Sequence, residues 1–253
     1  MLAGFAVPEP LLPFDGMRQP IRLSAPVSFA AFARLAAGIV EAGYAGDIEW
    51  SESVQEPQDA DGFAREAIFV ICNSGMRFTV AQGIFNRVME QLLANGSAHE
   101  AFGHKGKSDA IDRIWRDRER LLSEYRAAPD KLAFCESLPF IGGITKYHLA
   151  KNFGADVAKP DVHLQRLADW EGTTPQALCD RLAKESGYRA STVDLILWRA
   201  CAIGLINSRD LRVRDRSGEA VETVKQGSTE GESPTAKPER PKDGIILPEQ
   251  RGR

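Results

Sequence analysis

The chain has 253 residues, of which 43% are hydrophobic and 26% are charged, an ordinary composition for a soluble globular protein. No apolar run approaches the roughly 20 residues that a bilayer-spanning helix needs. The apolar segment at the start is interrupted by Pro8, Pro10 and Pro13 and lacks a basic region. These features argue against a membrane span and a signal peptide, and they predict a cytoplasmic protein with no membrane partner.

The four cysteines, Cys72, Cys135, Cys179 and Cys201, lie far apart in apolar stretches. Such cysteines are typical of buried free thiols in a reducing compartment. A cysteine metal site requires tighter spacing, such as a C-x-x-C pair, and the chain contains none.

The formal net charge is −3, which argues mildly against a nucleic-acid binder because phosphate contacts favour a basic face. The distribution of charge matters more than the sum. Acidic residues gather between Asp47 and Asp61, whereas basic residues gather later in the chain. The later group comprises Lys105, Lys107, Arg113, Arg116, Arg118, Arg120, Lys146, Lys151, Lys159 and Arg166. This distribution predicts a basic groove and an acidic back.

Apolar residues recur with helical spacing along nearly the whole chain, which predicts an all-α fold. The first helix is expected over Pro26–Ala42, ended by Gly43 and Gly46, with an acidic loop over Ser51–Gly62. Ser108 is the expected N-cap of the longest helix. The expected helices of this half are Pro26–Ala42, Phe63–Cys72, Phe78–Leu93 and Ser108–Tyr125.

The second half predicts shorter helices with clear end signals. Thr174 is expected as an N-cap with Pro175 at the first helical position, and Gly187 marks the end of that helix. The expected helices are Asp130–Glu136, Ile144–Phe153, a helix from Asp161 to Trp170, one from Pro175 to near Gly187, and Ser191–Leu205.

Composition divides the chain into three parts. Residues 1–24 are expected to form an irregular N-terminal segment, and residues 25–215 a helical domain. Residues 216–253 are dominated by Gly, Ser, Thr, Glu, Lys and Pro, and they carry too little apolar surface to form a core, so a disordered tail is expected.

The most informative segment runs from Leu138 to Ala168 and reads LPFIGGITKYHLAKNFGADVAKPDVHLQRLA. Its Gly-Gly turn precedes a helix, where backbone N–H groups and the helix dipole favour phosphate binding. About twenty residues later, Pro160-Asp161-Val162-His163 opens a second helix. Each feature also has a plain structural interpretation, because Gly-Gly turns between helices are common and aspartate is a favoured N-cap.

The combination resembles the helix-hairpin-helix DNA glycosylase family, which includes endonuclease III, the adenine mismatch glycosylase and 8-oxoguanine glycosylase. The resemblance implies two helical subdomains flanking a DNA-binding cleft, and an enzyme that flips a damaged base and hydrolyses its N-glycosidic bond. Asp161 would be the catalytic carboxylate that stabilises positive charge on the sugar. The residues implied to contact DNA at the hairpin are Gly142, Gly143, Thr145 and Lys146.

A second, shorter resemblance lies upstream. Ile71-Cys72-Asn73-Ser74 follows an apolar helix and is similar to the region where 8-oxoguanine glycosylases place the loop that fills the gap left by a flipped base. The resemblance implies that Asn73, Met76 or Arg77 supplies the filling group.

Family members with lyase activity carry a lysine two residues after the second glycine of G-x-G, and Ile144 occupies that position here. This implies a monofunctional glycosylase. Lys146 lies about 200° further around the helix, as a phosphate contact or a surface charge. Tyr147 and His148 share a face with Ile144, where they either line the base pocket or pack against a helix. His163 is a further pocket candidate with an expected structural role.

No cofactor is expected to be required. Iron–sulfur members of the family carry four closely spaced cysteines after the catalytic domain, and this chain has only Cys179 and Cys201 there. The resemblance implies a structural K⁺ or Na⁺ ion at the hairpin, held by the main-chain carbonyls of Glu136, Leu138 and Ile141.

The expected partner is double-stranded DNA that contains a damaged or modified base, bound by a monomer. Three alternatives stay open: a non-catalytic helix-hairpin-helix DNA-binding protein, a glycosylase with lyase activity through Lys146 or another lysine, and a glycosylase that removes modified bases from phage DNA.

Overall fold

A computed structural model describes residues 27–213, so the predicted irregular segment 1–24 and the predicted tail 216–253 lie outside the described residues. The elements are α1 (Phe29–Ile39), the π-helical turn η1 (Val40–Tyr44), α2 (Ala45–Ser53), α3 (Ala60–Asn73), α4 (Phe78–Leu93), the 3₁₀ turn η2 (Ala98–Glu100), α5 (Lys105–Ala127), α6 (Lys131–Ser137), α7 (Thr145–Asn152), α8 (Val162–Trp170), α9 (Pro175–Ser186), α10 (Ala190–Ala202), β1 (Ile206–Asn207) and β2 (Arg212–Val213). The predicted all-helical class is confirmed for these residues.

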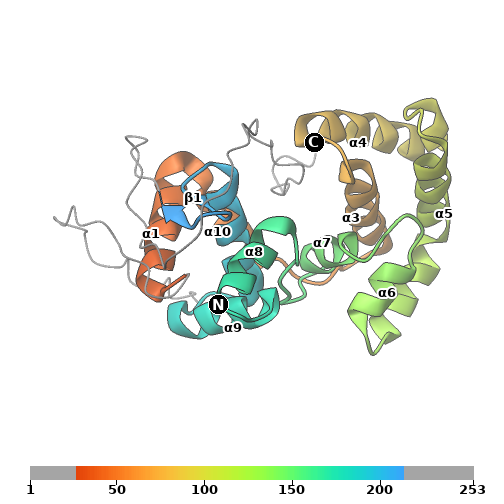
Figure 1. Cartoon of the computed structure of the whole chain (residues 1–253). Coiled ribbons are helices and arrows are strands. Elements are labelled where there is room, and N and C mark those ends of the chain that lie inside the picture. The colour runs from red at the N-terminus through yellow and green to blue at the C-terminus, as the bar shows by residue number, and fades with distance from the viewer. Residues whose placement is uncertain (1–26, 214–253) are drawn as a thin grey trace, which may run out of the picture.

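The helices gather around two separate apolar cores. The first core is formed by the helices from α3 through α7, and its centre is a set of aromatic rings. Phe63 stacks on Phe153 with 4.9 Å between ring centroids, and Tyr125 contacts both rings. Figure 1 shows α3, α4, α5 and α6 grouped on one side of the molecule, with α7 between them and the remaining helices.

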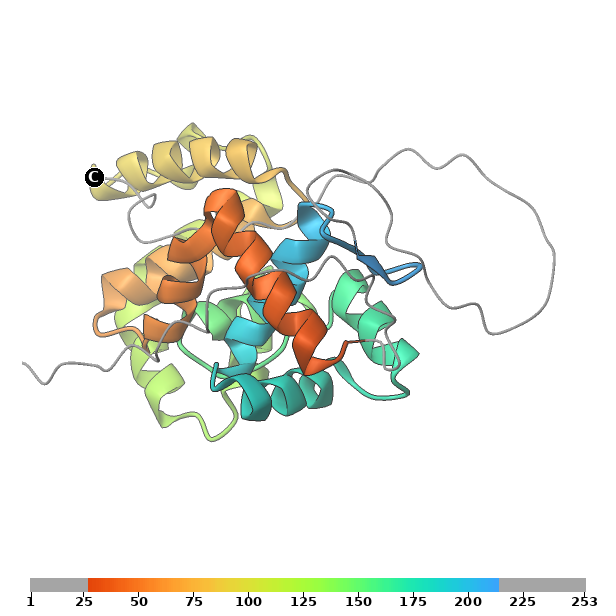
Figure 2. The ribbon, with the colours of Figure 1, turned by 90° about the vertical axis from the view of Figure 1, so that its left-hand side faces the viewer.

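The second core combines the start and the end of the described chain. It joins α1 and α2 to α8, α9, α10 and β1, with Phe32, Leu35, Leu167 and Ile196 fully or almost fully buried. Figure 2 shows α1 crossing in front of α10. The α3–α7 group is therefore inserted between two segments that together form the second core.

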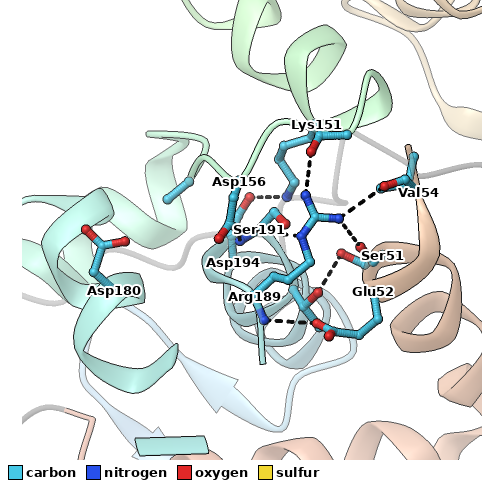
Figure 3. A network of polar contacts seen from close by, with 12 residues as sticks. Ser51, Glu52, Val54, Lys151, Asp156, Asp180, Arg189, Ser191 and Asp194 are labelled. Carbon is cyan, nitrogen blue, oxygen red and sulfur yellow. Dashed lines mark hydrogen bonds and ion pairs between the residues drawn. The ribbon is translucent and has the colours of Figure 1, made fainter. Parts of the chain in front are cut away.

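The chain crosses between the cores twice, at residues 54–59 and again at residues 154–160. The two crossings touch, because a Cβ on Gly154 would lie 2.8 Å from the backbone carbon of Gln55. Arg189 fastens them: its guanidinium donates to the carbonyls of Ser51 and Val54 at 3.0 and 3.2 Å, and to the carbonyl of Gly154 (Figure 3).

A buried ion pair also links the two groups. The Lys151 ammonium at the end of α7 pairs with the Asp194 carboxylate on α10, and their side chains are 7% and 2% exposed (Figure 3). The same carboxylate oxygen accepts the backbone N–H of Lys159 at 3.2 Å. Asp194 thus holds both α7 and the second crossing, which leads into α8.

Several predicted helix boundaries require correction. The acidic stretch 51–62 is not a single loop, because α2 continues to Ser53 and Asp59 caps α3 by accepting the Gly62 N–H at 2.7 Å. Gly43 does not end the helical path: with φ at 92°, it allows the π-helical turn that leads into α2. The predicted helix Ser191–Leu205 ends at Ala202, and the β1–β2 hairpin follows it.

Ser108 is not the N-cap of the longest helix. α5 begins one turn earlier at Lys105, and the N-cap is His104, whose ring nitrogen accepts the Lys107 N–H at 3.3 Å. Ser108 is buried and donates to the Phe102 carbonyl at 2.8 Å. The prediction missed the first turn because it carries no apolar residue to start the helical pattern.

The end signals of α9 are confirmed. Thr174 is the N-cap, with its hydroxyl accepting the Ala177 N–H at 3.2 Å, and Pro175 occupies the first helical position. Gly187 follows the helix with φ at 80°, a conformation that glycine adopts without steric strain.

Candidate active site and nucleic-acid interface

The predicted hairpin is a tight turn between α6 and α7. Leu138 and Ile141 are buried in the first core, and the Ile141 N–H donates to the Leu138 carbonyl at 3.1 Å. These two anchors leave the tip of the turn at the surface, where Gly142 and Gly143 are exposed and Ile144 is 48% exposed.

Three backbone donors at the start of α7 are open. The Gly142 N–H is already used, because it donates to the Thr145 hydroxyl at 2.7 Å. The N–H groups of Gly143, Ile144 and Thr145 donate to no other residue within 27–213. An exposed helix start with consecutive open N–H groups suits an anion such as a phosphate.

Lys146 is held by an ion pair. Its ammonium lies 2.5 Å from a carboxylate oxygen of Glu136 on α6, and this hydrogen bond raises the pKa of Lys146. A lysine nucleophile must lose its proton before it attacks. The partner therefore disfavours Lys146 as the source of a lyase activity.

The predicted pocket residues of α7 have different environments. Ile144 is exposed and Tyr147 is half-buried, with the Lys146 ammonium 5.6 Å from its ring centroid. His148 is buried, and its ring meets Phe69 edge to face at 6.3 Å. His148 thus packs in the first core, which is the structural alternative stated for it.

Asp161 is the N-cap of α8 and is half-buried. Its Oδ1 accepts the N–H groups of His163 and Leu164 at 2.9 and 3.0 Å. Among the residues that the structure describes, its Oδ2 accepts no hydrogen bond. Burial, together with a smaller effect of the Asp161 charge, raises the pKa of the Cys201 thiol to about 12.

An open hollow of about 570 Å³ borders α8. It is lined by Arg166, Asp169 and Trp170 of α8 and by Ser208 and Arg209 of the turn between β1 and β2. The predicted pocket residue His163 supports one wall, since its Nδ1 lies 3.0 Å from the Ser208 hydroxyl. Trp170 is 56% exposed, so the hollow offers a flat aromatic surface on the helix that Asp161 begins.

The predicted gap-filling residues lie at the turn between α3 and α4. Asn73 is the last residue of α3 and is 1% exposed, so its side chain does not reach a DNA duplex at the surface. Met76 is half-buried against the first core. Arg77 is exposed and precedes α4. Of the three predicted residues, Arg77 is the one in the exposed class.

The predicted basic groove needs correction for part of its residues. Lys107, Lys151 and Lys159 are buried, and several other predicted cations pair with carboxylates. The paired cations are Arg116, Arg118, Arg120 and Lys146. Arg77, Arg87, Lys105 and Arg113 are exposed and form no ion pair with any residue in 27–213.

Lys107, counted from the sequence only among the cations of the predicted groove, links the two predicted DNA-contacting turns. Its ammonium donates to the Ser74 carbonyl at 2.6 Å, and it lies 5.9 Å from the ring centroid of Phe140 at the hairpin tip. Burial lowers the pKa of Lys107. The first turn of α5 thus adjoins both the α3–α4 turn and the hairpin, whereas Asp161 belongs to the second helical group.

The monovalent cation expected at the hairpin stays a prediction. Of its three implied carbonyl ligands, that of Leu138 accepts the Ile141 N–H, which leaves one of its two lone pairs. No cluster of His, Cys, Asp or Glu side chains suited to a metal ion occurs within 27–213.

Comparison with known proteins finds no matching family model, no matching curated protein and no matching solved structure. Between residues 27 and 213, every helix is too short or too polar to cross a membrane.

Proposed function

We propose that this protein is a DNA glycosylase that flips a damaged or modified base and hydrolyses its N-glycosidic bond. One observation carries the proposal: Asp161 directly follows the hairpin, α7 and the second crossing, and it presents a half-buried carboxylate with one oxygen bonded to α8 and the other without a partner among residues 27–213. An N-cap needs only the bonded oxygen. The second oxygen is available to the reacting sugar.

The proposed chemistry follows from the charge of that carboxylate. Breaking an N-glycosidic bond develops positive charge on the sugar, as in the hydrolysis of other glycosides. A fixed negative charge beside C1′ stabilises this state, and the two N–H bonds from α8 prevent the carboxylate from turning away. A water molecule, activated or oriented by the same group, completes the hydrolysis.

DNA is proposed to bind on the hairpin side through its phosphates. The open N–H groups of Gly143, Ile144 and Thr145 suit one phosphate, and the exposed Arg77 and Lys105 add positive charge on the adjoining turns. Phosphate contacts of this kind fix the position of a protein on the duplex without reading sequence.

A monofunctional enzyme is proposed because Ile144 occupies the position of the lyase lysine. The neighbouring lysines are committed elsewhere: Lys146 to Glu136, Lys151 to Asp194, and Lys107 to the Ser74 carbonyl. Hydrolysis by water leaves an abasic site and an intact strand.

The test uses the wild type and Asp161→Asn on labelled duplexes that carry a panel of oxidised, alkylated and other modified bases. Asparagine caps helices as well as aspartate does, so this variant removes the charge and keeps the fold. We expect strand breaks only after alkali, and a loss of at least about 100-fold in the variant. Asp59→Asn, at the N-cap of α3, is the matched control and should retain full activity.

The other outcomes identify the alternatives. Strand breaks without alkali, with a borohydride-trapped adduct, would establish a lyase. Excision that Asp161→Asn leaves intact would remove Asp161 from the reaction. Tight DNA binding without excision of any base in the panel would favour a non-catalytic DNA-binding protein.

A further inference from the structure

At the tip of the hairpin, the backbone conformations do not match the residue types that usually adopt them. Phe140 adopts a left-handed backbone with φ at 66°, a region that favours glycine and strains other residues. Gly142 and Gly143 have no positive φ, and a Cβ on either would meet its nearest neighbour at an ordinary 3.9 or 3.6 Å. Gly142 and Gly143 therefore occupy positions that other residues could adopt without strain, whereas Phe140 occupies a position that favours glycine.

Burial does not explain the aromatic ring. Phe140 is 45% exposed, although apolar side chains in turns gain stability only from the area that they bury. The turn is anchored by the neighbouring Leu138 and Ile141, which are 4% and 6% exposed. Strained and exposed residues of this kind are found where a binding function maintains them.

The ring is nevertheless held in place from one side. His104 meets it edge to face at 5.4 Å, and the Lys107 ammonium lies 5.9 Å from its centroid. Gly106 provides the room, because a Cβ there would lie 3.2 Å from a Phe140 ring carbon. The first turn of α5 thus supports one side of an aromatic ring whose remaining surface faces solvent.

The charge around the ring identifies the kind of partner. Arg77 and Lys105 are exposed on the turns that adjoin Phe140 and form no ion pair within the described residues. Two residues beyond the ring, the glycines open the backbone to close approach. An aromatic ring between cations and open N–H groups matches a nucleotide, which combines a phosphate with an apolar sugar and base.

We propose that Phe140 is a DNA-contacting residue that packs against the sugar or base of the nucleotide whose phosphate binds at Gly143–Thr145. The inference rests on the proposed function and adds to it a residue that recognises DNA through an apolar contact. The glycines admit the phosphate, and the strained phenylalanine places its ring beside the same nucleotide.

The test is Phe140→Gly, assayed by binding to a duplex that contains a tetrahydrofuran abasic-site analogue. Removing a stacked aromatic ring weakens binding by about 1–3 kcal/mol, so we expect a loss of about 5- to 150-fold in affinity. The slope of log affinity against log salt should not change, because the ring neutralises no phosphate. Glycine also relieves the positive φ, so the urea midpoint should not fall appreciably.

Two further variants sharpen the result. Phe140→Trp keeps an aromatic surface and should bind within a few-fold of the wild type. Asn95→Gly is the matched control, because Asn95 also has a positive φ, at 61°, in an exposed turn at the far end of α4. This variant should leave DNA affinity unchanged.

Each outcome that contradicts the inference gives a different experimental result. Unchanged affinity in Phe140→Gly, with the wild type binding tightly, would overturn the role of Phe140 and leave the proposed glycosylase intact. A changed salt slope would assign Phe140 to positioning the phosphate contact instead. A wild type that binds neither the abasic analogue nor an undamaged duplex would overturn the inference and the proposed function together.

Discussion

Helices α7 and α8 follow one another in the chain but begin in opposite ways. At the start of α7, the N–H groups of Gly143, Ile144 and Thr145 have no partner within 27–213, and the preceding glycines are exposed. At the start of α8, Asp161 occupies the corresponding position and accepts two N–H groups itself. One helix start is open to an anion from outside, whereas the other is closed by an anion from its own chain.

This difference separates binding from chemistry. An open helix start attracts a phosphate but provides no group that reacts. A closed start binds no external phosphate, yet it fixes a carboxylate whose other oxygen is available. The two starts belong to different helical groups, joined by α7, the second crossing and the Lys151–Asp194 pair.

The largest expected loss of stability follows from breaking the Lys151–Asp194 ion pair, which connects the two helical groups. Asp194→Asn leaves the buried Lys151 ammonium without its counter-charge, and such a change destabilises a protein by about 3–5 kcal/mol. Urea denaturation measures this loss. The double variant Lys151→Met with Asp194→Leu should be closer in stability to the wild type than Asp194→Asn is. A double variant that is less stable than Asp194→Asn would contradict a simple ion pair.

A smaller effect is expected when the closed start is opened. Asp161→Ala removes the acceptor for the His163 and Leu164 N–H groups, which should lower the free energy of unfolding by about 1 kcal/mol. Asp161→Asn should change it by only a few tenths, because asparagine is an equally good cap. Thermal denaturation of the pair distinguishes the cap from the charge; equal losses in both variants would mean that the charge itself stabilises the fold.

The smallest effect on stability is expected when a side chain is added beside the open N–H groups at the start of α7. Gly143→Ala has room for its Cβ and an ordinary backbone, so its stability should match the wild type or rise by up to about 1 kcal/mol. DNA affinity should still fall, because the added methyl group stands beside the Gly143 N–H and limits how closely a phosphate can approach. Binding to the abasic duplex by fluorescence anisotropy checks this; unchanged affinity would show that no phosphate binds there.

The features that the sequence predicted correctly are those set by residues close together in the chain. Thr174, Pro175 and Gly187 bound α9 because capping and left-handed glycine act over a few residues. The hairpin between α6 and α7 was found in the same way. Two cations of the predicted basic groove are lost to it through partners in distant segments: Lys151 and Asp194 are 43 residues apart, and Arg118 pairs with Asp61 across 57 residues.

The same limit applies to the candidate site. Asp161 and the glycines were found from their spacing, but the burial of Asn73 depends on how α3 packs into the first core. Phe140 was visible in the sequence only as the third residue of the segment that begins LPFIGG. Its positive φ and its contact with Lys107 are properties of the folded turn, which no periodicity predicts.

The paired crossings between the cores constrain how the two helical groups move. A single linker permits rotation about any axis, whereas two linkers in contact at Gly154 and Gln55 leave one easy rotation, about the line through both. Arg189 bonds to both linkers and resists sliding of one along the other. The paired linkers therefore favour a hinge-like rotation of the groups over other relative motions, and the proposed DNA duplex, if it contacts both groups, selects one angle of that hinge.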